Sequence, residues 1–181
     1  EKSKFASYMH NIPFPFIILH FETGNPNREV NKKFLIEIIK KITDKTEFNL
    51  VLCGTSKESD RLFECFISQI PNLNYRIINA INKYSLDEFF SLSKYATAAL
   101  TLESLPAHFC AINCDTISLF NNGAGALFFP ISNKKSIVIH NDYESKDVTN
   151  SNNSRNYFVK QIESITTLNV IDDIIEELNL K

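Results

Sequence analysis

The sequence predicts an α/β fold with a doubly wound, mostly parallel sheet covered by helices on both faces. Short runs that are apolar throughout alternate with longer segments whose apolar residues recur at helical spacing. Strands that are apolar at every position are typical of sheets buried on both sides. With 181 residues and no internal repeat, we expect a single domain over residues 16–181, preceded by a linker at 1–15.

The predicted strands are short apolar runs bounded by polar or turn-forming residues. The first, FIILHF, follows Pro13 and Pro15, and the second, NLVLC, ends at Gly54. The expected strands cover residues 16–21, 49–53, 75–79, 98–102, 116–120 and 136–140. The polar segment 141–156, rich in Asn and Ser, is predicted to be a mobile surface loop.

The predicted helices carry one apolar stripe each. A helix beginning at Asn31 has lysines and glutamate on one face and an apolar opposite face made of Phe34, Leu35, Ile38, Ile39 and Ile42. Ser85 and Glu88 have the spacing of a capping box, which predicts a helix over 85–96. The other expected helices cover about 62–70, 106–112 and 170–178.

Composition and charge exclude several function classes. The net charge of −2 lacks the basic excess of a nucleic-acid-binding surface, so no nucleic-acid partner is expected. No apolar window approaches the roughly 20 residues of a transmembrane helix, and no signal peptide opens the chain. The four cysteines form no C-x-x-C pair, so we interpret them as small buried hydrophobic residues rather than as a metal or redox site. Free cysteines are typical of a reducing, cytoplasmic compartment. His10, His20 and His140 have no partners at ligand spacing, so no metal is predicted.

Ligands of doubly wound sheets bind at the carboxyl ends of the strands, and this places the candidate site. The loops to examine are 21–30, 54–58, 79–85, 102–108 and 120–135. Within 103–108, Ser104 can cap the following helix and Pro106 suits its first turn. A helix amino end attracts phosphate, and His108 projects from its first turn. From the residues alone, a phosphate site and a plain helix cap with a structural histidine are equally supported.

Several stretches resemble glycosyltransferase family 9, the lipopolysaccharide heptosyltransferases. ESLPAH at 103–108 resembles the family's D-[ST]-G-x-x-H motif. The likeness continues in order through FIILHFETGNPNREVNKKF, FNLVLCGTSKESD, the segment 84–120 and QIESITTLNVIDDIIEEL. It covers roughly residues 16–180 and is more specific in order and spacing than in residue identity.

The resemblance implies the C-terminal, Rossmann-like half of a two-domain GT-B fold. That half binds a nucleotide sugar, usually ADP-heptose, as a substrate, without a metal or other cofactor. The N-terminal acceptor-binding domain, which carries the catalytic base, is then a partner absent from this chain. The implied protein is bacterial and cytoplasmic, peripheral at the inner membrane, and acts in lipopolysaccharide biosynthesis. The isolated chain is expected to be inactive.

The same resemblance assigns donor-binding and phosphate-binding roles to individual positions. Glu103 stands for the family's aspartate, Ser104 for its serine or threonine, and His108 for its histidine. Arg28 matches a lysine that contacts the donor phosphates, and Thr23 lies in the same loop. Leu105 departs from the motif, because a glycine there would let a phosphate approach the backbone. The alternative is therefore a degenerate, non-catalytic Rossmann-like module that binds a nucleotide or a protein.

Overall fold

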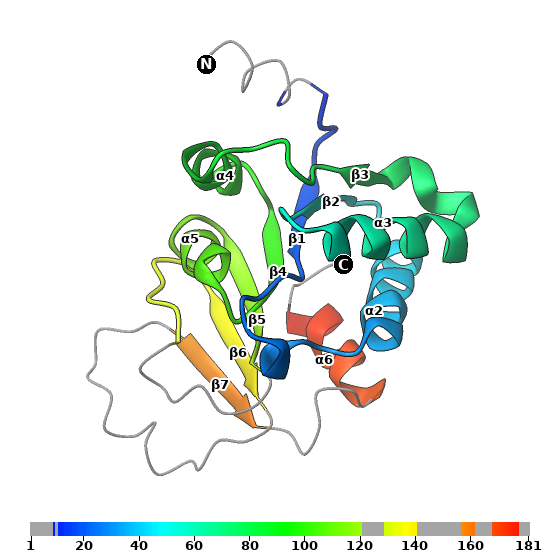
Figure 1. Cartoon of the computed structure of the whole chain (residues 1–181). Helices are drawn as coiled ribbons and strands as arrows, with labels where there is room; N and C mark the ends of the chain where they lie inside the picture. The colour runs from blue at the N-terminus through cyan, green and yellow to red at the C-terminus, as the bar shows by residue number, and fades with distance from the viewer. Residues whose placement is uncertain (1–8, 10, 121–128, 141–156, 162–167, 178–181) are drawn as a thin grey trace.

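The computed structural model describes residues 9, 11–120, 129–140, 157–161 and 168–177. In these residues, seven strands form one parallel sheet in the order β3-β2-β1-β4-β5-β6-β7 (Figure 1). The predicted α/β fold is confirmed. The strands are β1 Phe16–His20, β2 Asn49–Cys53, β3 Ile77–Asn79, β4 Ala98–Leu102, β5 Asp115–Phe120, β6 Ser136–His140 and β7 Tyr157–Gln161.

Helices cover both faces of the sheet, as Figure 1 shows. One face carries α4 (Leu86–Ser93) and α5 (Leu105–Asn113). The other carries α2 (Lys32–Lys45), α3 (Lys57–Gln69) and α6 (Leu168–Glu177). Two 3-10 helices, η1 (Pro26–Arg28) and η2 (Pro71–Arg76), lie in the connections. None of the helices in this part of the chain combines the length and apolarity that a bilayer crossing needs.

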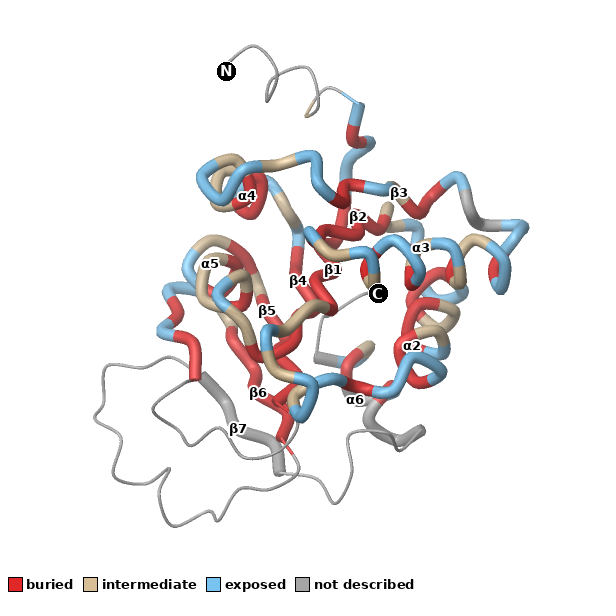
Figure 2. Tube along the Cα trace, in the orientation of Figure 1, coloured by how far each residue is buried: buried red, intermediate tan, exposed pale blue. Residues whose placement is uncertain are grey.

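The alternation of side chains along each strand builds two cores. In β1, Ile17 and Leu19 join the core under α2, α3 and α6, whereas Phe16 and Ile18 join the core under α4 and α5. All five residues of β1 are buried, and the buried strands run through the middle of Figure 2. This two-sided burial explains why the strands are apolar at every position.

Two strand predictions need correction. The strand expected at 75–79 begins only at Ile77, because residues up to Arg76 belong to the 3-10 helix η2. The strand β7 was not predicted: its sequence, YFVKQ, lacks a continuous apolar run, and it pairs only with β6 at the edge of the sheet. The predicted loop 141–156 lies outside the described residues.

Arg76 fixes the connection between α2 and β2 from the inside. Arg76 is only 4% exposed, and its guanidinium donates hydrogen bonds to the carbonyls of Thr43 at 3.0 Å, Thr46 at 2.5 Å and Phe48 at 2.6 Å. The first two carbonyls belong to the last turn and C-cap of α2, where a cation is favoured by the helix dipole. One buried side chain therefore satisfies backbone oxygens that have no partner within the helix.

Gly54 lies where β2 meets its loop and has no room for a side chain. A Cβ there would lie 2.3 Å from Ser59 Oγ and 3.0 Å from Glu22 Oε2. A Cβ added at Gly24, in the loop after β1, would meet nothing within 4 Å. The glycine at 54 is thus required for packing between the loop and the start of α3.

We expect Gly54→Ala to lower the free energy of unfolding by about 1–3 kcal/mol, the usual cost of overpacking. Gly24→Ala is the matched control and should change stability by less than about 1 kcal/mol, with a small gain from the stiffer unfolded chain. Urea unfolding of the three proteins measures both effects. Equal stability of the two variants would contradict the close approach at Gly54.

Candidate functional site

A cavity of about 450 Å³ opens at the carboxyl edge of the sheet. The segments that follow β1, β2, β3 and β4 all contribute to its walls, as expected for a doubly wound fold. Its lining residues are His20, Glu22, Thr23, Gly24, Cys53, Gly54, Thr55, Ala80, Tyr84, Ser85, Leu86, Phe89, Ser104, Leu105 and Pro106. The predicted segment 120–135 contributes no described residue to it.

The cavity lies at the point where the strand order reverses. β1 pairs in parallel with β2 on one side and with β4 on the other. The crossover after β1 runs to β2 on one side, and the crossover after β4 runs to β5 on the other side, so the loops after β1 and β4 diverge and leave a crevice between them. Tyr84, Leu86 and Phe89 form an apolar wall near the start of α4, while Glu22 and Thr55 supply polar groups from the loops.

The amino end of α5 forms one end of the cavity, with Ser104, Leu105 and Pro106 among the lining residues. Ser104 occupies the N-cap position as predicted, but its hydroxyl makes no cap hydrogen bond and donates instead to the Leu102 carbonyl at 3.2 Å. The expected side-chain cap is therefore wrong. Pro106 has no N–H, and the Ala107 N–H donates to the Ser104 carbonyl at 3.1 Å. Because Ser104 makes no cap hydrogen bond, the Leu105 N–H is left available to an anion.

Arg28 and Glu103 are brought together beside this helix end. Arg28 Nη1 lies 3.2 Å from Glu103 Oε1, and the Arg28 side chain is 35% exposed whereas that of Glu103 is 5% exposed. Neither carboxylate oxygen of Glu103 accepts a hydrogen bond. Burial raises the pKa of Glu103, and the Arg28 charge opposes that shift. The pair joins the loop after β1 to the end of β4.

Arg28 and Glu103 are not among the residues that line the cavity, and the remaining predicted residues divide between the cavity and its surroundings. Thr23 and Leu105 line the cavity, and Leu105 is 52% exposed. His108 is half-buried in the first turn of α5 and is not among the lining residues. Burial lowers the pKa of His108, so the protein by itself does not favour the charged form that a phosphate contact would favour. The roles of all six predicted residues stay predictions.

The sequence interpretation missed several lining residues. Glu22 Oε2 accepts a hydrogen bond from the Thr55 backbone N–H at 2.7 Å and so ties the loops after β1 and β2 together. Tyr84 lies in the loop 79–85, which was expected near the ligand, and Phe89 lies in the predicted helix 85–96, but neither was named as a site residue. His20 ends β1 on the cavity floor and was set aside for lack of a metal-binding partner.

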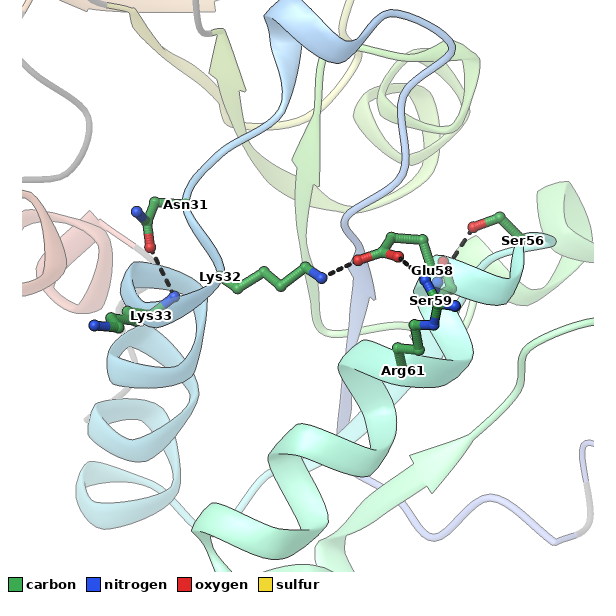
Figure 3. Close-up of polar contacts among 7 residues, drawn as sticks. All are labelled: Asn31, Lys32, Lys33, Ser56, Glu58, Ser59 and Arg61. Carbon is green, nitrogen blue, oxygen red and sulfur yellow. Dashed lines mark hydrogen bonds and ion pairs between the residues drawn. The ribbon is translucent and has the colours of Figure 1, made fainter.

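A second cavity of about 220 Å³ lies between the loop after β1 and the amino ends of α2 and α3. Figure 3 shows two of its charged lining residues in an ion pair: Lys32 pairs with Glu58, which also contacts Arg61. The helix ends are capped by Asn31 and Ser56. The larger cavity is therefore the better candidate for a ligand.

The described residues around the two cavities favour neither a bound metal ion nor a reactive thiol. Cys53, Cys110 and Cys114 are buried and Cys65 is half-buried; all four are free thiols. Burial raises the pKa of Cys53, which keeps its thiol protonated. In the described part of the chain, no group of three or more His, Cys, Asp or Glu side chains is placed to hold a metal ion.

Comparisons with known proteins place the fold. No protein-family model matches the chain, and no curated protein matches it. Among solved structures, E. coli heptosyltransferase WaaC with ADP is similar, with a TM-score of 0.67 and 12% identity over 96% of this chain and 48% of that one. The glycosyl transferase family 9 structure from Veillonella parvula has a TM-score of 0.67 and 14% identity over 98% and 49% of the two chains. E. coli ADP-heptose LPS heptosyltransferase II has a TM-score of 0.67 and 14% identity over 99% of this chain and 52% of that one.

The fold is that of the Rossmann-like half of GT-B glycosyltransferases, as the resemblance implied. The chain spans about half the length of each of the three solved structures. At 12–14% identity, the likeness shows the fold, and the chemistry of the site has to be argued from its own residues.

We expect Glu103→Gln to raise stability at neutral pH, because the pKa of Glu103 is raised by burial. A carboxyl whose pKa is raised on folding destabilises the native state above that pKa, and this penalty disappears as pH falls and the group is protonated. The advantage of the variant should therefore shrink between about pH 7 and pH 4.

Glu58→Gln is the control of opposite sign, because the hydrogen bond from Lys32 lowers the pKa of Glu58. This variant should lose stability at neutral pH, and the loss should fade in acid. Urea unfolding across the pH range measures both. A Glu103→Gln variant that is less stable than the wild type at neutral pH would show that the Arg28 contact outweighs burial.

Proposed function

We propose that this chain binds a nucleoside-diphosphate sugar in the large cavity and forms the donor-binding part of a family 9-like glycosyltransferase. The observation that carries the proposal is the uncapped amino end of α5, which opens into a cavity at the reversal point of the sheet. A structure with the same fold contains ADP. The sugar would be a heptose or a related sugar, and the acceptor a lipopolysaccharide-type glycan.

The negative charge of the diphosphate sets the chemistry required of this chain. In sugar transfer, the bond from the anomeric carbon to the diphosphate breaks, a bond to an acceptor hydroxyl oxygen forms, and the nucleoside diphosphate leaves with its charge. The backbone N–H groups of Ser104 and Leu105 and the Arg28 guanidinium would hold that charge. The proton of the acceptor hydroxyl would go to a base in the acceptor-binding domain, so we expect this chain alone to bind the donor without transferring the sugar.

A non-catalytic module is the second candidate function, and two observations favour it. Arg28 is already paired with Glu103, and Leu105 presents a side chain to the cavity at the position where the family motif has glycine. A thermal-shift screen with ADP, UDP, GDP and CDP separates the two, because a ligand that binds only the folded state raises its stability. A shift with at least one nucleotide supports a donor site; no shift with any of them favours a module that binds a protein.

Arg28→Ala should weaken nucleoside-diphosphate binding by about 1.5–3 kcal/mol, as for a hydrogen bond to a charged group. The change also leaves the buried Glu103 carboxylate without its cation, which lowers stability by a separate route. The titration is therefore made in the Glu103→Gln background, where that second effect is absent.

Arg61→Ala is the matched control for Arg28. Neither arginine is among the residues that line the large cavity, but Arg28 contacts Glu103 just before α5, whereas Arg61 is a 71% exposed arginine on α3. Isothermal titration should show unchanged binding for this control. If Arg28→Ala bound the nucleotide as tightly as its parent, the guanidinium would have no part in the site.

Leu105→Gly should tighten binding of a nucleotide sugar, because the leucine side chain occupies space beside the α5 amino end. The same change should lower stability by about 1 kcal/mol, the helix cost of glycine. Ile112→Gly, near the other end of α5 and outside the cavity lining, should lower stability without changing affinity. Weaker binding by Leu105→Gly would show that the leucine supports the site rather than obstructs it.

A further inference from the structure

His20 occupies an unusual place for a polar side chain. It is the last residue of the central strand β1, and the alternation along the strand puts it on the same face as Ile18, under α4. The residue is 8% exposed, and its ring meets the Phe89 ring edge-on at 5.8 Å between centroids. Both His20 and Phe89 line the large cavity.

The hydrogen-bonding capacity of this imidazole is only partly used by the described residues. Nδ1 is buried and has no hydrogen-bond partner among them. His20 also lines the large cavity, where a ligand can approach the ring. A buried polar group without a partner destabilises a fold, and a leucine would fill the same apolar surroundings without that cost. The position therefore points to a role outside the folding of the chain.

The charge of His20 narrows the kind of group that it can bind. Burial lowers the pKa of His20 to about 4, with the nearby Glu22 carboxylate opposing the shift. The imidazole is then neutral at pH 7, with one N–H donor and one lone-pair acceptor. Such a ring suits a neutral hydroxyl or amine partner, whereas a phosphate favours a cation.

The cavity lining has two chemically different parts. Ser104, Leu105 and Pro106 at the amino end of α5 provide the part that favours an anion, whereas Arg28 is paired with Glu103 and is not among the lining residues. His20, with the apolar wall of Tyr84, Leu86 and Phe89, provides a neutral part suited to a flat ring that carries hydroxyl or amine groups.

We propose that His20 is a positioning residue that hydrogen-bonds the nucleoside part of the bound nucleotide through its ring, while the diphosphate lies at the amino end of α5. This inference rests on the proposed function and deepens it. It assigns different lining groups of one cavity to the two parts of the ligand. The contact would orient the nucleotide without contributing charge.

The test compares His20→Leu with the wild type in titrations with ADP, UDP and inorganic pyrophosphate. Losing one hydrogen bond between neutral groups should weaken nucleotide binding about five- to tenfold. Pyrophosphate has no nucleoside, so its affinity should not change. His20→Gln, which keeps a donor and an acceptor, should retain most of the affinity for nucleotide.

His140→Leu is the matched control. His140 is the buried last residue of β6 and does not line the cavity, so its replacement should change neither nucleotide nor pyrophosphate binding. Thermal unfolding checks the fold, and His20→Leu should be at least as stable as the wild type because it removes an unpartnered buried nitrogen. A second readout uses the wild type alone: the NMR signal of the His20 ring should move with the bound nucleotide and not with pyrophosphate.

Three outcomes would overturn the proposal. Unchanged nucleotide affinity in His20→Leu, with an unmoved ring signal, would remove His20 from the site. An equal loss of pyrophosphate and nucleotide affinity would show a general effect on the cavity. A wild type that binds none of ADP, UDP and pyrophosphate would overturn the proposed function as well, which distinguishes that failure from the first two.

Discussion

The pairing of β1 with both β2 and β4 is the constraint from which the rest of this structure follows. The five residues of β1 are buried, and the strand has a parallel partner on each side. Its last residue, His20, is level with Cys53 of β2 and Thr101 of β4. Three strands therefore end together, and the loops that leave them must share one edge of the sheet. The large cavity is the space between those loops.

Local contacts then hold the loops in place. Gly54 allows Ser59 and Glu22 to approach the end of β2, and Glu22 in turn accepts the Thr55 N–H. On the far side of the same crossover, Arg76 binds carbonyls at the end of α2 and before β2. These contacts give the cavity walls a defined position without a ligand, which is the condition for a preformed site.

The sequence predicts the core of this fold well, because strands buried on both faces carry a continuous apolar signal. The segments 49–53, 98–102 and 136–140 were predicted with the bounds that the structure shows. β7 was missed because an edge strand with a mixed sequence has no such signal. The placement of the site at the carboxyl edge followed from topology, but the Arg28–Glu103 contact joins residues 75 positions apart and has no local signature. Ser104 is a second case that the sequence alone could not predict. Its position fits a helix cap, but its hydroxyl donates to the Leu102 carbonyl instead.

The two charged residues that the sequence singled out acquire a different meaning in three dimensions. In the sequence, Arg28 is a loop residue that was predicted to bind a phosphate. In the structure its guanidinium faces a buried carboxylate that accepts no hydrogen bond, and the raised pKa of Glu103 shows that the pairing does not fully offset burial. Burial thus leaves both Glu103 and His20 with side-chain atoms that have no hydrogen-bond partner among the described residues, Glu103 just before α5 and His20 in the cavity lining. Both groups lower the stability of the fold at the carboxyl edge of one sheet. Unsatisfied buried polar groups in native proteins are found mainly at functional sites, which favours a binding role for this edge.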